Sequence, residues 1–259
     1  MNINHKKNGN MEKIRVIGFD ADDTLWVNEP MFRRVEKTCL GMLETYADPA
    51  IIRERLIAVE QENIRVFGYG VKGFLLSLVE TALEVGADNI SGSDIQKIIA
   101  LGKEMLASPV ELLDGIETVL ETLCQKFRLM MITKGDLLDQ ESKIARSNLA
   151  PYFDHIEIVS EKDEATYGRV LLKHGILPHE FMMVGNSLRS DILPVVNIGG
   201  HAVHVPFFTT WEHEQVSLSS VDQSSWLTLS TIGDLPGRLL IPENLSCRAN
   251  MVVRQILSD

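Results

Sequence analysis

Short apolar segments that alternate with helical patterns constrain the fold of this chain more than any other feature. Each segment is too short for a buried helix, and most are rich in valine, isoleucine or methionine, as expected of buried strands. Strands that alternate with helices predict a parallel sheet covered by helices on both faces. The predicted strands are residues 14–19, 128–133, 155–159, 181–184 and 202–205, and the predicted helices between the later strands are 115–126, 140–148, 163–174 and 191–198.

The long segment between the first and second predicted strands breaks this alternation. Residues 31 to 107 show no strand pattern, and their apolar side chains recur at helical spacing in about four stretches. Pro30 and Pro109 lie near the two junctions, where prolines commonly mark boundaries. A separate lobe is favoured over helices packed directly on the sheet. We predict a disordered leader at 1–10, a core domain formed by 11–29 and 109–259, and a helical cap domain at 30–108.

The tail after residue 205 carries weaker signals. Trp211, Trp226 and Leu227 are expected to be packing residues. Residues 232–240 could form a last helix, interrupted by Pro236.

Net charge and cysteine usage exclude several classes of protein. The formal net charge is −11 at pH 7, and an acidic surface repels nucleic acid and anionic membranes. Cys39, Cys124 and Cys247 are far apart and form no CxxC pair, which argues against a structural zinc site or a disulfide framework. No secretory signal or membrane-spanning run is visible, so we expect a cytoplasmic protein. The oligomeric state stays open.

An acidic cluster directly follows the first predicted strand. The sequence Asp20-Ala21-Asp22-Asp23-Thr24 places carboxylates at a strand end in apolar surroundings, which is costly without a compensating charge. Two acids at positions i and i+2 can face one site, where a cation relieves their repulsion. The alternative is a solvated acidic turn, and Asp23 is expected to be a surface or loop-stabilising acid.

Four motifs in order resemble those of the haloacid dehalogenase superfamily. FDADDTLW resembles the first motif, a strand followed by DxDx(T/V)(L/V), and LMMIT, which ends in Thr133, resembles the second. Lys162 in SEKDEATY resembles the third-motif lysine, and MMVGNSLRSD, which ends in Asp191, resembles the fourth motif. The resemblance covers residues 14 to about 205 and implies a Rossmann-like α/β core with an inserted all-α cap.

The resemblance implies roles for these residues in phosphoryl transfer. Asp20 would attack phosphorus and form an aspartyl-phosphate, and Asp22 would act as general acid and then as general base. Thr133 and Lys162 would bind the phosphoryl oxygens, with Lys162 also neutralising Asp20. Lys134 could reach the phosphate as well. Either Lys134 or Lys143 could compete for the role of Lys162.

A magnesium cofactor is implied by the same resemblance. Asp20, the backbone carbonyl of Asp22, and Asp191 could supply its protein ligands. The chain departs from the family pattern at Asn186, where many relatives have aspartate. Asn186 could bind the metal through its carbonyl oxygen or support the ligands from behind.

A phosphohydrolase acting on a small phosphorylated metabolite is the favoured function. Asp22 favours an oxygen leaving group over a halide, since halide needs no proton. A sugar-phosphate phosphomutase and a catalytically inactive binding domain are the alternatives. The glycine-containing segment GYGVKGF suggests a loop between cap helices, and its candidate substrate contacts are Tyr69, Lys72 and Phe74, although Phe74 could equally pack in the cap core.

Overall fold

The core of the protein is a parallel sheet of six strands. The computed structural model describes residues 14–209 and 223–240. The strand order is β3-β2-β1-β4-β5-β6, with every neighbouring pair parallel. The predicted α/β class is therefore confirmed. The strands are β1 (Val16–Phe19), β2 (Arg128–Lys134), β3 (His155–Val159), β4 (Phe181–Gly185), β5 (His201–His204) and β6 (Leu227–Thr228).

All five predicted strands are present, and a sixth escaped prediction. β6 has only two residues, which is too short to produce an alternating apolar pattern. The first strand begins at Val16 instead of residue 14, and the last predicted strand is shifted by one residue. Strand ends are the least certain part of any assignment from sequence.

The register of the sheet gathers the motif residues at one edge. Phe19 of β1 pairs with Met131 of β2 and with Val184 of β4. The residues that follow these three strands therefore leave the sheet side by side at its carboxyl edge. This is the edge at which ligands bind in open α/β sheets.

Alternate side chains of the strands enter two separate apolar clusters, one on each face. On one face, Ile17 and Phe19 pack with α6 (Ile116–Leu123) and α10 (Leu235–Leu239). On the other face, Val16 packs with residues of α8 (Glu164–Lys173) and α9 (Leu193–Asn197). The period of two follows from strand geometry. α7 (Leu137–Ser147) adds Ile144 to the first cluster.

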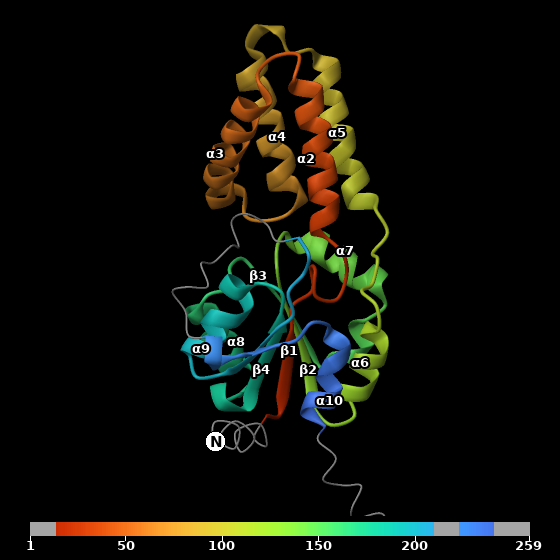
Figure 1. The fold of residues 1–259 in the computed structure, drawn as a ribbon, viewed down its shortest axis with the longest axis vertical. Helices are drawn as coiled ribbons and strands as arrows, with labels where there is room; N and C mark the ends of the chain where they lie inside the picture. The colour runs from red at the N-terminus through yellow and green to blue at the C-terminus, as the bar shows by residue number, and fades with distance from the viewer. Residues whose placement is uncertain (1–13, 210–222, 241–259) are drawn as a thin grey trace, which may run out of the picture.

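Four of the helices between β1 and β2 in the chain form a bundle over the carboxyl edge of the sheet (Figure 1). Their inner faces make an apolar cluster that shares no residue with the two sheet clusters. The predicted all-helical insertion is confirmed, while the domain boundaries stay a prediction. The helices are α2 (Glu29–Leu43), α3 (Pro49–Phe67), α4 (Val71–Gly86) and α5 (Gly92–Ala107).

Two helix predictions near the C-terminus need correction. The predicted helix 191–198 begins earlier, as a π-helix over Leu188–Ile192 that continues into α9. Pro236 does not interrupt the last helix, because it lies in the first turn of α10, where its missing N–H group costs nothing. The leader, Trp211 and Cys247 lie outside the described residues. Among the helices that are described, none is long and apolar enough to cross a bilayer.

Candidate active site

Asp20 lies at the centre of the site, directly after the central strand. Its backbone N–H donates to the carbonyl of Val184 at 2.9 Å, which continues the pairing of β1 with β4 by one residue. Its Oδ1 is paired with the ammonium group of Lys162, and its Oδ2 accepts a hydrogen bond from Thr24 Oγ1 at 3.2 Å. Burial raises the pKa of Asp20 and the neighbouring Asp191 adds to this, while Lys162 opposes it.

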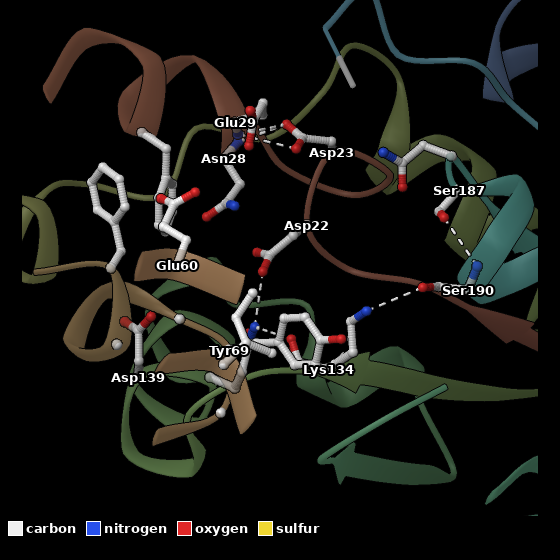
Figure 2. A pocket seen from close by; sticks show the side chains of 18 of the residues that line it. Asp22, Asp23, Asn28, Glu29, Glu60, Tyr69, Lys134, Asp139, Ser187 and Ser190 are labelled. Carbon is white, nitrogen blue, oxygen red and sulfur yellow. Dashed lines mark hydrogen bonds between the residues drawn. The ribbon is translucent and has the colours of Figure 1, made fainter. Parts of the chain in front are cut away.

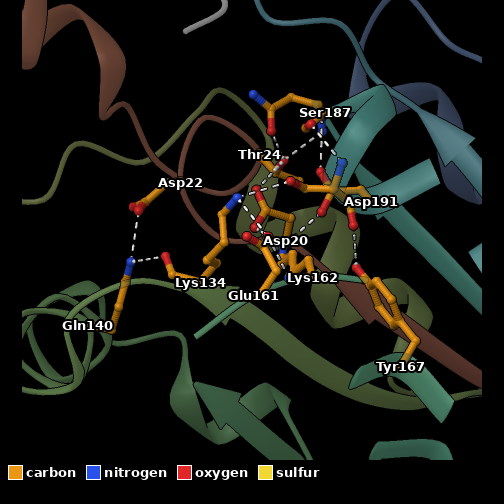
Figure 3. Close-up of polar contacts among 12 residues, drawn as sticks. Asp20, Asp22, Thr24, Lys134, Gln140, Glu161, Lys162, Tyr167, Ser187 and Asp191 are labelled. Carbon is orange, nitrogen blue, oxygen red and sulfur yellow. Dashed lines mark hydrogen bonds and ion pairs between the residues drawn. The ribbon is translucent and has the colours of Figure 1, made fainter. Parts of the chain in front are cut away.

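Lys162 joins two buried carboxylates. Its Nζ contacts Asp20 and lies 2.7 Å from Asp191 Oδ1 (Figure 3). The residue is only 4% exposed. Burial by itself disfavours the charged ammonium, but Asp191 and Asp20 hold the pKa of Lys162 well above its usual value. The predicted third-motif lysine thus reaches the first and fourth motifs, whereas Lys143 and Lys134 lie elsewhere in the site.

The loop after β4 is built around Asp191. Its Oδ1 faces Lys162, and its Oδ2 accepts a hydrogen bond from the backbone N–H of Ser187 at 2.9 Å. Gly185 is required at the start of this loop, because a Cβ there would lie 2.2 Å from Asp191 Oδ2. Tyr167 supports the loop from below by donating to the carbonyl of Ser190 at 3.0 Å.

Thr133 is a fully buried residue near the end of β2, next in sequence to Lys134, which lines the pocket, but it is not itself among the residues that line it. It is 0% exposed, and its hydroxyl has no hydrogen-bond partner among the described residues. A buried hydroxyl without a partner costs free energy in the empty protein. A ligand oxygen that accepts a hydrogen bond from the Thr133 hydroxyl would remove this cost, so the binding of such a ligand would be favoured.

Asp22 points away from Asp20, toward α7. Its carboxylate accepts from Lys143 Nζ at 2.7 and 2.9 Å, from Gln140 Nε2 at 2.8 Å and from Trp26 Nε1 at 2.7 Å. Burial alone would raise its pKa, but these donors, Lys143 first among them, hold the pKa of Asp22 below its ordinary value. In Figure 3, Asp22 and Gln140 lie together to the left of the cluster around Asp20.

The sequence did not predict that Gln140 and Lys143 of α7 bind the carboxylate of Asp22. Gln140 and Lys143 are three positions apart and lie on one face of a helix that starts just after β2. A polar pair at that spacing, after a motif-bearing strand, was the available signal. Lys143 was considered only as a rival of Lys162.

Asp23 is loop-stabilising, as predicted, but it is not on the surface. It is 7% exposed, and its carboxylate accepts from the backbone N–H groups of Asn28 at 2.8 Å and Glu29 at 3.0 Å. Its φ of 60° places it in the left-handed region, which aspartate tolerates better than most residues. Asp23 therefore fixes the connection from β1 to the first cap helix.

Lys134 and Tyr69 lie where the cap meets the core. Lys134 Nζ is 3.1 Å from Ser190 Oγ, 3.4 Å from Glu161 Oε1 and 4.0 Å from the centre of the Tyr69 ring. The Tyr69 hydroxyl donates to Glu161 Oε2 at 2.7 Å. A cap residue thus contacts a core lysine and a core carboxylate at the edge of the site. Figure 2 shows Tyr69 beside Lys134.

The segment GYGVKGF is only partly a loop, which corrects the prediction. α4 begins at Val71, so Lys72 and Phe74 belong to its first turn. Lys72 Nζ pairs with Asp136 Oδ1 at 2.8 Å, and Lys72 is not among the described residues that line the pocket. Tyr69 and Phe74 do line it, although Phe74 also packs on the cap cluster.

One pocket connects these residues with the cap. Asp20, Asp22, Lys162 and Asp191 line it from the core, and side chains of α2, α3 and α4 line the part that we call the upper pocket. Figure 2 shows Glu29 and Glu60 of the cap around the same space as Asp22. The cap therefore covers the carboxyl edge of the sheet and encloses a space above Asp20. Enclosure of this kind excludes water and suits a small ligand.

The oxygen donors around Asp20 fit magnesium in kind. The Thr24 hydroxyl lies 3.2 Å from Asp20 Oδ2 and 3.3 Å from Asn186 Oδ1, so it brings these two oxygens together. Magnesium takes few protein oxygens and completes its shell with water and phosphate. Both oxygens of Asp191 already have protein partners, as both oxygens of Asp20 do, and within the described residues no group of three His, Cys, Asp or Glu forms a metal site. Asp20 and Asn186 are the predicted ligands whose oxygens lie together here, and the parts of Asp191 and of the Asp22 carbonyl as ligands stay predictions.

Comparison with known proteins identifies the family. The sequence matches the haloacid dehalogenase-like hydrolases over residues 14–199, most of the chain. The protein belongs to this family and is a hydrolase. A solved haloacid dehalogenase-like hydrolase from Xanthomonas campestris is 36% identical, with a TM-score of 0.79 over 92% of this chain and 95% of that one.

Curated relatives that match along nearly their whole length are phosphatases. N-acylneuraminate-9-phosphatase of Mus musculus is 25% identical over 94% of this chain and 99% of its own. Glyceraldehyde 3-phosphate phosphatase of Methanothermobacter thermautotrophicus is 24% identical over 81% and 93%. The HAD-hydrolase YfnB of Bacillus subtilis, solved bound to magnesium, shares the fold at 17% identity, with a TM-score of 0.59 over 88% of this chain and 99% of that one.

Proposed function

We propose that the protein is a magnesium-dependent phosphatase of small phosphorylated metabolites that works through an aspartyl-phosphate on Asp20. The observation that carries the proposal is the ion pair between Asp20 and the buried Lys162, both of which line a pocket covered by the cap. A second carboxylate, that of Asp22, lies two positions after Asp20 in the sequence and lines the same pocket. The phosphatase relatives support the same reaction class. A sugar-phosphate phosphomutase and an inactive binding domain stay as the alternatives predicted from sequence.

In the first step, a carboxylate oxygen of Asp20 attacks phosphorus and the bond from phosphorus to the ester oxygen breaks. The leaving oxygen takes a proton from Asp22, which can carry one only after its side chain has left Lys143 and Gln140, the donors that hold its pKa low in the present arrangement. Lys162 Nζ and the Thr133 hydroxyl donate to the phosphoryl oxygens, whose charge grows as the transition state forms. The buried Thr133 hydroxyl, which has no partner among the described residues, supports this assignment.

In the second step, water attacks the phosphorus of the aspartyl-phosphate and gives a proton to Asp22, and the bond from Asp20 to phosphorus breaks. Asp22 lies against Lys143 and Gln140 in the present arrangement. The mechanism therefore requires the Asp22 side chain to turn from α7 toward the ester oxygen once substrate is bound. Lys143 and Gln140 hold Asp22 in the absence of substrate.

Magnesium would be held by Asp20, Asn186 and the backbone carbonyl of Asp22. Asn186 brings no negative charge, so a site with this residue is expected to bind the ion less tightly than one with aspartate there. When bound, the ion neutralises charge between the Asp20 carboxylate and the phosphoryl group as they approach each other. Asp191 is assigned a supporting position, in which it holds Lys162 against Asp20.

Phosphate release tests the proposal. We expect the wild type to release phosphate from p-nitrophenyl phosphate and from small metabolite phosphates with magnesium, and to stop when EDTA is added. Asp20→Asn, which keeps the shape of the side chain, is expected to be inactive. Release that persists in Asp20→Asn would contradict the proposal, and no release from any phosphate would favour the mutase or the inactive domain.

A further inference from the structure

The cap side of the pocket carries more acidic than basic side chains. α2 contributes Glu29, Arg33 and Glu36 to the pocket lining, and α3 contributes Glu60. Glu29 and Glu60 are labelled in Figure 2. We call these four residues the cap wall. They face the space in which the organic part of a substrate would lie if its phosphate were bound above Asp20.

The positive charge of Arg33 is already matched within the cap wall. Its Nε lies 2.9 Å from Glu29 Oε1 and its Nη1 lies 3.3 Å from Glu36 Oε2. A second acidic group on a substrate would have to displace one of these carboxylates and approach the others, and like charges brought together in an enclosed site are strongly unfavourable. Glu60 adds a third carboxylate to the same wall.

Apolar side chains also line the upper pocket. Phe32 and Phe74 lie with their ring centres 5.1 Å apart, and Leu56, Ile57 and Ile64 of α3 line the same space. Carboxylates accept hydrogen bonds from hydroxyl and ammonium groups. Aromatic and aliphatic side chains suit the C–H face of a polyol. Together these groups match a ligand that donates hydrogen bonds and carries no acid of its own.

We propose that the preferred substrate is a phosphomonoester whose organic part carries hydroxyl or ammonium groups and no second acidic group. This inference rests on the proposed phosphatase function and narrows its substrate class. It also separates the protein from its neuraminate relatives, because an N-acylneuraminate carries a carboxylate in addition to the phosphate.

Matched substrate pairs test the inference. Sorbitol 6-phosphate has a terminal hydroxymethyl group where 6-phosphogluconate has a carboxylate, and the two compounds are otherwise the same. Glycerol 3-phosphate and 3-phosphoglycerate differ in the same way. We expect kcat/KM to be at least about tenfold higher for the member without the carboxylate. Glucosamine 6-phosphate, which adds an ammonium group, is expected to be hydrolysed at least as well as glucose 6-phosphate.

Paired variants show whether the cap wall causes the selectivity. Glu36→Gln combined with Glu60→Gln removes two of its charges, so the ratio within each pair is expected to fall to about threefold or less. Glu44→Gln combined with Glu54→Gln is the matched control, because these exposed acids lie at the end of α2 and on α3, outside the pocket lining. The control is expected to keep the wild-type ratio.

Hydrolysis of p-nitrophenyl phosphate separates this inference from the proposed function. If the wild type hydrolyses that ester but treats both members of each pair equally, or prefers the carboxylates, the inference is overturned and the phosphatase function stands. The same holds if the ratio is unchanged in the folded Glu36→Gln/Glu60→Gln variant. A wild type that releases phosphate from no substrate overturns both together.

Discussion

At the scale of single residues, the site is held together by one buried cation between two buried carboxylates. Lys162 is 4% exposed, and its partners Asp20 and Asp191 are buried with it. Buried charges are tolerated when they are paired, and removal of one partner leaves the others without compensation. The arrangement therefore links the stability of the core to the residues proposed for catalysis.

Lys162→Met tests this link. In the absence of magnesium, we expect the variant to lose about 3–5 kcal/mol of unfolding free energy, because two carboxylates remain in the core without their cation. Urea denaturation measures the loss. Lys173→Met is the control, since that ammonium group is exposed and its loss is expected to cost less than about 1 kcal/mol. Equal stability of the two variants would contradict the buried ion triad.

The sequence indicated the acidic and basic members of the site but not their partners. Asp20 directly follows a strand, Lys162 lies just before a helix, and Asp191 lies in the π-helix after β4. Parallel strands bring such positions together at one edge of the sheet. The contacts of Asp22 with Gln140 and Lys143 depend on how α7 is rotated on the sheet. The rotation of a helix about its axis, and hence the direction of its side chains, follows from tertiary packing, which no local sequence pattern encodes.

At the scale of elements, the cap and the core meet through the start of α4 and the loop before it. Tyr69 donates to Glu161 and lies under Lys134, and Lys72 pairs with Asp136 at the start of α7. The sequence of residues 68–74 predicts a loop over its whole length, whereas α4 begins at Val71. The helix start at Val71 was missed, because glycines such as those at positions 68 and 70 are typical of loops.

Tyr69→Phe removes only the hydroxyl that joins the cap to Glu161. We expect kcat/KM to fall by about three- to tenfold, mainly through a higher KM, because the closed cap loses one partly buried hydrogen bond. Steady-state kinetics measure this. Tyr152→Phe is the matched control, since its hydroxyl donates to Glu121 on an exposed part of the core. Unchanged kinetics in Tyr69→Phe would show that the contact does not hold the cap.

At the scale of the whole molecule, the protein has separate apolar cores in the cap and on the two faces of the sheet. The alternation of strand and helix and the interruption at residues 31–107 predicted this division. The two-residue β6 and the π-helix before α9 escaped prediction, because both depend on tertiary packing more than on local pattern.

Separate cores predict separate local stabilities. Leu78 is 1% exposed in the cap cluster, and Leu78→Ala is expected to cost about 2–5 kcal/mol. Hydrogen exchange should then rise in α2 to α5 while the amides of β1, β2 and β4 stay protected. Leu76→Ala, on the same helix but 44% exposed, is the control. Equal loss of protection in the strands would show that cap and core unfold as one unit.

The most direct test of the account is whether a phosphoryl group is trapped on Asp20. In Asp22→Asn, p-nitrophenolate can leave without a proton, but water lacks its base for the second step. We therefore expect a burst of p-nitrophenol and a phosphorylated peptide containing Asp20, detected by mass spectrometry after acid quench. Asp20→Asn should give neither. The central claim would be contradicted if the wild type turns over substrate while Asp22→Asn carries no phosphoryl group on Asp20. A phosphoryl group found on another residue would contradict it as well.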